Sequence, residues 1–393
     1  MHNKSGWTAT GVGVWLAICS GCAGYDTPVS GPLWDDAASS DASSDVATDT
    51  AKVGQDIAAF TPGLPISVED KKWQYVEVPG TYCRDGKTTG FAINANPKSD
   101  KLVIFLEGGG ACFNDLTCAV NPMHYDYSPG IGAASLQRDG VNPFADWSFV
   151  YIPYCTGDVF SGTAMEGHNG EPQVGYTNIG KFLERIVPTF QGKLSTVVLT
   201  GVSAGGFGVA WNWLRVQDAF GPTVAVHALD DSGPPMSGKY LTPCMQQRLS
   251  ALWGWQDSLH PACTACDLTA GNVVQPLIDV ALQRQVGRRF GLLSHDEDSI
   301  IKFFYSFGLD NCAAIDEVIF PPEFATGLFP EGLSDLRAHL AGKTNAAVFE
   351  THGQAHVVVG SPGGWSASVG GTTALQWFTW FRDGDPKWVD FAP

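Results

Sequence analysis

Runs of apolar residues, separated by glycine-rich or polar turns, recur along the chain from residue 101 onward. Five runs have the length of β-strands and are almost wholly apolar, which is typical of strands covered on both faces of a sheet. Two longer stretches, 179–190 and 209–220, have helical periodicity. This alternation predicts an α/β fold with a mostly parallel sheet and helices on both faces. The predicted strands cover residues 101–106, 147–153, 196–200, 223–229 and 345–350.

The N-terminal residues 1–22 have the pattern of an export signal. Lys4 precedes a short apolar run, residues 11–18, which is too brief to span a bilayer. Small residues before Cys22 are typical of a bacterial lipoprotein cleavage site, so we expect Cys22 to carry a lipid. Cys19 is a second candidate for lipidation, and a plain secretory signal is the alternative. Each of these interpretations predicts an exported protein, either an outer-membrane or cell-surface lipoprotein or a secreted one.

Residues 23–65 form an acidic segment without apolar periodicity. They contain seven Asp and one Lys among many Ser, Ala and Thr residues. Such a composition cannot bury enough apolar surface to fold, so it predicts a disordered tether. We expect residues 66–393 to form a single globular domain behind it.

Charge and cysteine content narrow the possible partners. The formal net charge of −17 disfavours nucleic acid as a partner, because phosphate binding needs a basic surface. Without Cys19 and Cys22, eight of the ten cysteines remain, and an even number in an exported chain predicts four disulfides. A zinc site at Cys263 and Cys266 is disfavoured because no second pair lies at a suitable spacing. We therefore expect no metal.

A candidate nucleophile lies in Gly201-Val-Ser-Ala-Gly205. This G-x-S-x-G pattern joins a predicted strand to a predicted helix. In that setting the serine occupies a strained turn, and its hydroxyl stands above the end of the sheet. The motif alone is weak, but its setting identifies Ser203 as a nucleophile.

Other candidate groups follow other predicted strands. Gly108-Gly-Gly110 ends an early strand, and its backbone N–H groups, with that of Ala204, are suited to hold an oxyanion. His352 and His356 follow the last predicted strand, and we prefer His356 as the base because the apolar residues 357–359 anchor its loop. Functional groups gather beyond the carboxyl ends of parallel strands, so these groups should meet at one edge.

The acid partner of the histidine remains open at this level. Asp298 precedes an apolar helix as a potential N-cap, which would also give it a structural role. In this type of fold the catalytic residues follow one another along the chain as serine, acid and histidine. An acid at position 230 or 231 would come only one strand after the serine, earlier than is usual. The candidates are Asp230, Asp231, Asp296, Asp298, Asp310 and Asp316.

Four segments together resemble the pectin acetylesterase and Notum-like family of serine carboxylesterases, which has an α/β-hydrolase fold. The resemblance extends over about residues 73–360, and the second and third segments are rather specific to that family. The segments are YCRDG at 82–86, FLEGGGACFN at 105–114, IPYCTGDVFSG at 152–162 and GVSAGG at 201–206.

The resemblance assigns roles to individual residues. It implies Asp298 as the acid and His356 as the base, although the histidine loop differs in detail from the family pattern and His352 remains an alternative. Many family members have an aromatic residue where this chain has Ala111, close to the acyl pocket. The implied oxyanion donors are Gly109, Gly110 and Ala204, and the implied disulfides are Cys83–Cys155 and Cys112–Cys118. The pairing of Cys244, Cys263, Cys266 and Cys312 stays undetermined.

The sequence therefore predicts a serine carboxylesterase that needs no cofactor. Its expected substrates carry small acyl groups, acetyl above all, on a polysaccharide, and its expected state is a monomer. One alternative is a lipid or protein O-deacylase. Another is a catalytically inactive carbohydrate-binding protein, against which the complete set of serine, histidine and acid argues.

Overall fold

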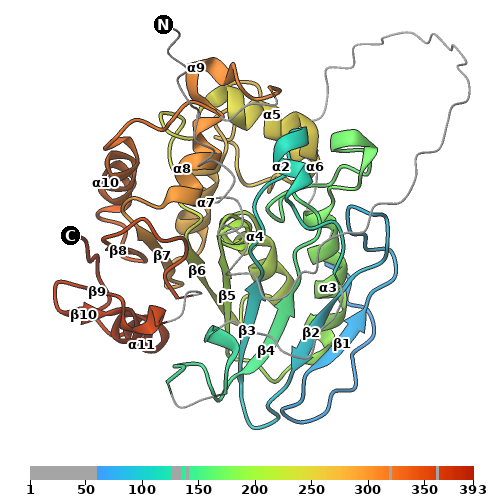
Figure 1. Cartoon of the computed structure of the whole chain (residues 1–393). Coiled ribbons are helices and arrows are strands. Elements are labelled where there is room, and N and C mark those ends of the chain that lie inside the picture. The colour runs from blue at the N-terminus through green and yellow to red at the C-terminus, as the bar shows by residue number, and fades with distance from the viewer. Residues whose placement is uncertain (1–59, 126–133, 139–140, 318–320, 360–362) are drawn as a thin grey trace, which may run out of the picture. The chain divides into compact units, whose positions relative to one another are not determined.

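One sheet organises the molecule, with strand order β1-β2-β4-β3-β5-β6-β7-β8 (Figure 1). This computed structural model describes residues 60–125, 134–138, 141–317, 321–359 and 363–393. Strands β3 to β8 run parallel to one another, while β1 and β2 add antiparallel pairing at one edge. The predicted fold class, an α/β-hydrolase-like, mostly parallel sheet, is confirmed.

The strands of this sheet are β1 (Gln74–Glu77), β2 (Gly90–Asn94), β3 (Lys101–Leu106), β4 (Ser148–Ile152), β5 (Thr196–Val202), β6 (Ala225–Asp231), β7 (Phe290–His295) and β8 (Ala346–Thr351). A small hairpin adds β9 (Ser368–Val369) and β10 (Thr372–Thr373). The helices are α2 (Asp115–Ala119), α3 (Gly175–Thr189), α4 (Ala204–Phe220), α5 (Pro243–Trp253), α6 (Trp255–Ser258), α7 (Val274–Arg284), α8 (Ser299–Ser306), α9 (Leu309–Cys312), α10 (Leu328–Leu340) and α11 (Ala374–Asp383).

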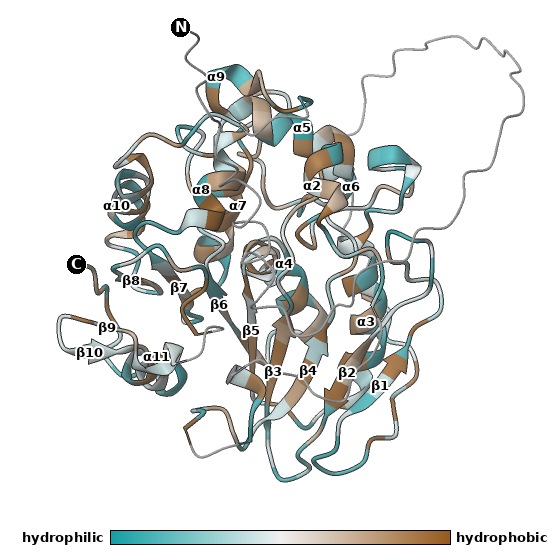
Figure 2. Ribbon diagram, viewed as in Figure 1, coloured by the Kyte–Doolittle hydropathy of each residue, from teal (hydrophilic) through white to brown (hydrophobic). Residues whose placement is uncertain are grey.

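The central strands are apolar on both faces because both faces are covered. In β3, Leu102 and Ile104 belong to one hydrophobic cluster with residues of α3, α4 and α7, while Val103 belongs to a second cluster with residues of α11. Figure 2 shows these strands as the brown centre of the fold. Burial of one such side chain stabilises the fold by roughly 1.5–3 kcal/mol. The unbroken apolar runs in the sequence follow from this two-sided cover.

The compact unit begins at Phe60, and the structure does not describe the residues before it. Residues 60–65, which the sequence assigns to the tether, contact α3: the Gly63 N–H donates to the Glu184 carbonyl at 2.8 Å. Phe60 packs against the core, so this aromatic side chain extends the folded unit into the predicted tether. The predicted export signal and Cys22 lie outside the described residues.

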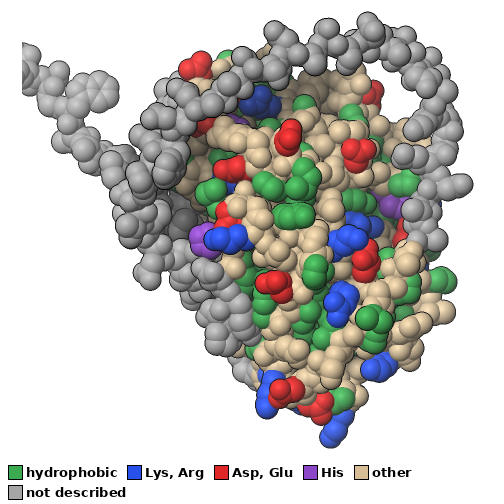
Figure 3. Space-filling model, turned by 90° about the vertical axis from the view of Figure 1, so that its right-hand side faces the viewer, with side chains coloured by type: hydrophobic (Ala, Val, Ile, Leu, Met, Phe, Trp, Pro, Cys, Tyr) green, Lys and Arg blue, Asp and Glu red, His purple; other side chains and the backbone are tan. Residues whose placement is uncertain are grey.

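Helix length, potential metal ligands and surface charge bear on whether the protein binds membranes, metals or nucleic acids. In the described part of the chain no helix is both long and apolar enough to cross a membrane, and the same residues contain no group of three potential metal ligands. The face shown in Figure 3 carries acidic and basic side chains interspersed, and basic residues do not gather on it.

The described cysteines form four disulfides, Cys83–Cys155, Cys112–Cys118, Cys244–Cys312 and Cys263–Cys266. The first two are the pairs that the family resemblance implied. The other two bonds pair the four cysteines whose partners the sequence left undetermined. Because Cys263 and Cys266 bond to each other, they are not available as zinc ligands in this state.

Candidate active site

Ser203 occupies the sharp turn between β5 and α4. Its backbone has φ 57° and ψ −121°, a left-handed conformation that is strained for a residue with a side chain. The turn is tight because α4 starts directly against β3: a Cβ atom added to Gly205 would lie 2.1 Å from the Leu106 carbonyl oxygen. The Ser203 N–H is bonded to the Asp231 carbonyl at 2.8 Å. The local sequence therefore holds the serine in the geometry of a nucleophile elbow.

Asp298 is buried between β7 and α8 and uses both of its carboxylate oxygens. Oδ1 caps α8 by accepting the N–H groups of Ile300 and Ile301 at 3.0 Å each. Oδ2 lies 2.8 Å from Nδ1 of His356. A carboxylate can only accept, so the proton of this contact belongs to Nδ1, and Nε2 of the neutral ring is left as a proton acceptor. Oδ1 also lies 3.1 Å from the same Nδ1, so Oδ1 contacts both the helix and His356, while Oδ2 makes the shorter contact with His356.

Asp298 and His356 meet because the pairing of β7 and β8 continues into the loops that follow. The Asp296 N–H donates to the Thr351 carbonyl at 2.9 Å, and the Glu297 N–H donates to the Gly353 carbonyl at 3.1 Å. The Ser299 N–H then donates to the Gln354 carbonyl at 3.2 Å. Two segments 58 residues apart in sequence are thus held in register up to the histidine.

The alternative histidine has a different partner and a different environment. His352 Nδ1 lies 2.6 Å from Asp296 Oδ2, and the His352 side chain is 80% exposed. The His356 side chain is 21% exposed, and its carboxylate partner Asp298 is fully buried. A second histidine–aspartate pair therefore exists beside the first, but at the surface.

Asp231 anchors the histidine loop. Its carboxylate accepts the N–H groups of Val358 and Val359 at 2.8 Å each, while its backbone carbonyl accepts the Ser203 N–H. Desolvation by burial raises the pKa of the Asp231 carboxyl, and these hydrogen bonds oppose that rise. One buried residue thus connects the serine turn to the loop of His356. The sequence marks Asp231 only as a candidate acid, since no residue pattern reveals its bonds to two backbone N–H groups.

The remaining acid candidates have other partners or lie at the surface. Asp230 is buried, accepts the Gly233 N–H at 2.8 Å, and has a pKa raised well above its usual range by desolvation. Asp296 pairs with His352, as described above. Asp316 pairs with Arg248 at 2.6 Å, and Asp310 is exposed.

The glycine loop after β3 lies against the serine. A Cβ atom added to Gly108 would lie 3.1 Å from Cβ of Ser203. Gly110 has φ +82°, where a side chain would be strained, and it lines the same pocket as Ser203 and Ala204. Among the described residues, the N–H groups of Gly109 and Gly110 find no hydrogen-bond acceptor. Ala204 is the first residue of α4, so its N–H has no partner within the helix. These three residues therefore offer N–H groups near the serine hydroxyl.

An apolar pocket opens beside Ser203. It holds about 750 Å³ of empty space, part of it open to solvent, and no charged side chain lines it. Its walls come from the oxyanion loop and from helices α4, α5, α7 and α8, which lie far apart in sequence. The aromatic and sulfur-containing residues of the wall are Phe113, Phe207, Trp211, Met245, Trp253, Trp255, Phe304 and Tyr305.

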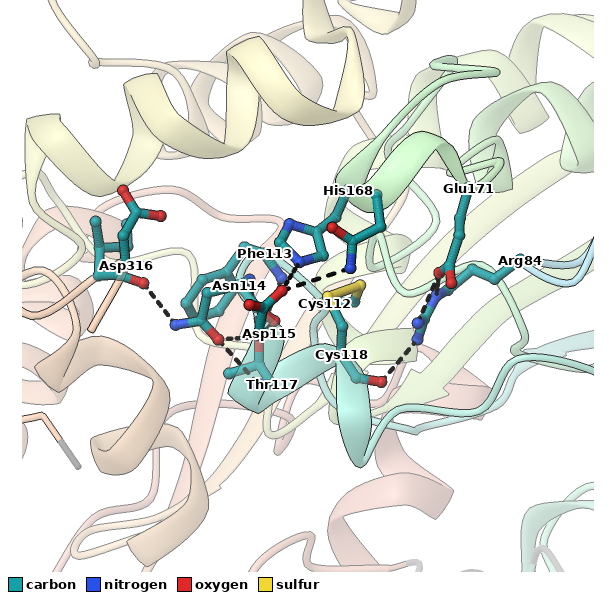
Figure 4. Close-up of polar contacts among 12 residues, drawn as sticks. Arg84, Cys112, Phe113, Asn114, Asp115, Thr117, Cys118, His168, Glu171 and Asp316 are labelled. Carbon is teal, nitrogen blue, oxygen red and sulfur yellow. Dashed lines mark hydrogen bonds and ion pairs between the residues drawn. A yellow bond between two sulfur atoms is a disulfide. The ribbon is translucent and has the colours of Figure 1, made fainter. Parts of the chain in front are cut away.

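A polar frame supports the loop that follows Gly108, Gly109 and Gly110 (Figure 4). The Cys112–Cys118 disulfide closes this loop, and the buried Arg84 donates to the Cys118 carbonyl at 3.2 Å and pairs with Glu171 at 2.7 Å. Asn114 caps α2 and donates to the Ile315 carbonyl at 2.6 Å. The frame ties the loop to parts of the chain on both sides of it.

Glu107 lies directly before the glycine loop. Its Oε2 accepts the Tyr154 N–H at 2.8 Å. Desolvation by burial raises the pKa of the Glu107 carboxyl to about 7, and hydrogen bonds from Tyr151 and Tyr154 only partly oppose that rise. A carboxyl group that titrates near neutrality therefore adjoins the candidate oxyanion hole.

Comparison with known proteins adds independent information. A profile of the Pectinacetylesterase family matches residues 72–266, which include Ser203, the glycine loop and Ala204. Palmitoleoyl-protein carboxylesterase notum2 of Xenopus laevis is 32% identical over 186 residues, 42% of this chain and 37% of that protein. Human palmitoleoyl-protein carboxylesterase NOTUM is 31% identical over 176 residues, 38% of this chain and 34% of that protein. These matches span about a third of the relatives' own length.

Solved structures extend the similarity of fold beyond the matched sequence. The structure of the Wnt deacylase Notum from Drosophila has a TM-score of 0.60 and 19% sequence identity, and the match covers 82% of this chain and 96% of that chain. At such identity the likeness concerns the fold. Together with the profile and the sequence relatives, it supports the resemblance of this chain to the pectin acetylesterase and Notum-like family.

Proposed function

We propose that this protein is a carboxylic ester hydrolase with Ser203 as nucleophile, His356 as base and Asp298 as the acid that orients the base. One observation carries the proposal: a serine in a strained turn at an apolar pocket is accompanied by a buried aspartate 2.8 Å from a histidine Nδ1. The chain order of serine, aspartate and histidine suits this chemistry. An inactive binding protein would have no need of the strained turn.

The proposed reaction has two halves. The Ser203 hydroxyl oxygen attacks the ester carbonyl carbon while its proton passes to Nε2 of His356. The carbonyl oxygen becomes an oxyanion and accepts N–H groups of Gly109, Gly110 and Ala204. The C–O bond to the alcohol then breaks, and the His356 proton goes to the leaving oxygen. Water repeats the sequence on the acyl-serine with His356 as base, which releases the carboxylic acid and restores the serine.

Asp298 acts on the imidazole. Its carboxylate accepts the Nδ1 proton, so it selects the tautomer whose Nε2 can take the serine proton. It also stabilises the imidazolium that forms in each half of the reaction. Burial strengthens this electrostatic effect because solvent screens it less.

The pocket supports an acyl group longer than acetyl. An acetyl group has a single methyl to bury, whereas the pocket wall presents eight aromatic or methionine side chains and no charge. Each methylene that enters such a wall gains roughly 0.8 kcal/mol. The match to the Pectinacetylesterase profile favours the second candidate, an acetyl ester on a carbohydrate. We also infer export, since four disulfides suit an oxidising compartment.

A substrate series tests both the catalytic role of Ser203 and the proposed length of the acyl group. The purified protein and its Ser203→Ala variant are assayed on p-nitrophenyl esters from acetate to palmitate, and on acetylated xylan and pectin. We expect the highest kcat/KM on esters of medium or long chains, and a loss of about 10⁴-fold or more in the variant. Highest activity on acetyl esters would select the second candidate. Equal activity of the variant and the wild type would refute the catalytic assignment.

A further inference from the structure

The two glycine carbonyls of the oxyanion loop are each held by a buried side chain. The amide Nδ2 of Asn121 lies 2.8 Å from the Gly109 carbonyl oxygen, and the Tyr154 hydroxyl donates to the Gly110 carbonyl at 2.8 Å. A carbonyl oxygen can only accept, so Asn121 must direct its NH₂ group toward Gly109. Both side chains are largely buried. The loop therefore does not rely on its glycines alone for its conformation.

The bond from Asn121 determines where the next N–H group points. A trans peptide is planar, and its C=O and N–H bonds are antiparallel. The described residues contain no cis peptide. When Asn121 fixes the Gly109 carbonyl, it fixes the Gly110 N–H of the same peptide in the opposite direction. This N–H therefore points away from Asn121, and Gly110 lines the pocket with Ser203, whereas Asn121 does not.

Glycine makes this support necessary. Gly110 at φ +82° has no side chain to restrict its backbone, and glycine populates many conformations at similar cost. Without an external bond, the Gly109–Gly110 peptide could rotate and turn its N–H away from the reacting carbonyl. The same hydrogen bond polarises the peptide, which makes its N–H a better donor.

Asn121 is itself held in place. The guanidinium of Arg84 donates to the backbone carbonyls of Cys118 and Asn121, at 3.2 Å each. The Asn121 N–H donates to the Cys118 carbonyl at 3.3 Å, and Cys118 is joined to Cys112 by a disulfide. Figure 4 shows Arg84 between Glu171 and the disulfide loop. The frame around the disulfide thus fixes the residue that orients the peptide.

We propose that Asn121 is a positioning residue of the oxyanion hole, where its amide orients the Gly109–Gly110 peptide so that the Gly110 N–H meets the developing oxyanion. The proposal rests on the proposed esterase function. Asn121 does not touch the substrate. It acts through a backbone group whose charge stabilisation is needed in the transition state more than in the bound substrate.

The test removes the Asn121 amide and compares the result with a matched change. Asn121→Ala and Asn121→Leu both delete the donor, and the leucine retains the volume. Asn96→Ala is the control, because Asn96 is also buried and donates its amide to a backbone carbonyl, that of Asp146 at 2.6 Å, but belongs to neither the pocket nor the frame. Measurements on a p-nitrophenyl ester give kcat and KM, and an alkyl boronic acid that forms a tetrahedral adduct with the serine gives an inhibition constant.

For both Asn121 variants we expect kcat to fall about 10- to 100-fold with KM changed less than about threefold. This is smaller than the roughly 10²- to 10³-fold loss when an oxyanion donor is removed outright, because the N–H remains but is no longer held. Boronic acid affinity should fall by the same factor as kcat/KM. Asn96→Ala should lower the melting temperature and leave kcat within about threefold of the wild type.

Two results would overturn this role for Asn121. One is a kcat in both variants no lower than that of Asn96→Ala. The other is a loss confined to KM with boronic acid affinity retained. The wild type and Ser203→Ala are measured in the same series. If the wild type lacked serine-dependent esterase activity, the proposed function would fail, and this inference with it.

Discussion

Two histidines four positions apart differ in what surrounds them, and that difference predicts their effect on activity. His356 faces a fully buried carboxylate, whereas the exposed His352 forms a surface pair with Asp296. Such surface pairs contribute about 0–1 kcal/mol. We expect His356→Ala to lose nearly all kcat/KM on a p-nitrophenyl ester, and His352→Ala to change it only a few-fold. An inactive His352→Ala beside an active His356→Ala would place the base on the wrong histidine.

Glu107 predicts a pH dependence of stability. Its folded-state pKa of about 7 lies above the ordinary value of 4.5, so between these pH values the folded protein keeps a proton that the unfolded chain has lost. Stability from this group is therefore greatest below about pH 4.5, declines as pH rises, and is lost above about pH 7. The shift corresponds to up to about 3 kcal/mol.

Glu107→Gln keeps the shape of the side chain and removes this titration. Urea unfolding at several pH values measures the free energy of unfolding of both proteins. The variant should gain stability relative to the wild type as pH rises from about 4.5 to 7, and the difference should be constant outside that window. A difference that does not vary with pH would mean that the Glu107 pKa is not raised in the folded protein.

Helix α8 and the candidate triad share one residue, and its two functions can be separated. Asparagine caps helices about as well as aspartate, whereas alanine costs roughly 1 kcal/mol at such a position. Asp298→Asn should therefore keep the cap of α8 yet lower kcat by about 10⁴-fold, because the amide favours the wrong histidine tautomer. Asp298→Ala should lose both activity and stability.

Thermal unfolding combined with kcat measurements distinguishes these outcomes. Asp230→Asn serves as the comparison, since Asp230 is equally buried and its carboxylate binds the Gly233 N–H. That variant should retain catalysis if it folds. Near-normal kcat in a folded Asp298→Asn protein would remove Asp298 from the triad and return attention to the other acids.

At the level of elements, the sequence pattern predicted some boundaries well and missed others. The predicted strand 101–106 is identical to β3, since its apolar run 102–106 lies between the charged residues Lys101 and Glu107 and so has clear ends. Helix α4 begins at Ala204, five residues before the predicted start, because its first turn is rich in glycine and lacks apolar periodicity. Strand β7 was not predicted as a strand, since Gly291 and Ser294 interrupt its apolar run. Glycine suits position 291 because an added Cβ atom would lie 2.8 Å from the ring of Trp377.

For the molecule as a whole, the sequence predicted the fold but not the pocket, and its candidate catalytic residues stay predictions. Functional groups at the carboxyl ends of parallel strands can be inferred from strand order, and this placed Ser203 and His356 together. Asp298 needed the family resemblance. The pocket wall draws on residues from Gly110 to Tyr305 on several helices, and no local pattern records such a gathering. The sequence motifs favour an acetyl substrate, whereas this wall supports a longer acyl group.

The disulfides supply a final prediction. A chain beginning at residue 23 carries only the eight described cysteines, so after unfolding without reductant it should contain no free thiol. Four or more reactive thiols in a titration would contradict the four bridges. A bridge that closes a longer loop restricts the unfolded chain more. Cys83–Cys155 spans 72 residues and Cys263–Cys266 spans 3.

Replacement of Cys83 and Cys155 by serine should therefore lower the free energy of unfolding by roughly 4 kcal/mol, and the same change at Cys263 and Cys266 by about 2 kcal/mol or less. Chemical denaturation of the two double variants measures both values. A larger loss at the short bridge would show that native contacts around Cys263, rather than loop entropy, determine its contribution. A larger loss at the long bridge would instead mean that long bridges stabilise the protein mainly by restricting the unfolded chain. This stabilisation persists only where the compartment keeps the cysteines oxidised.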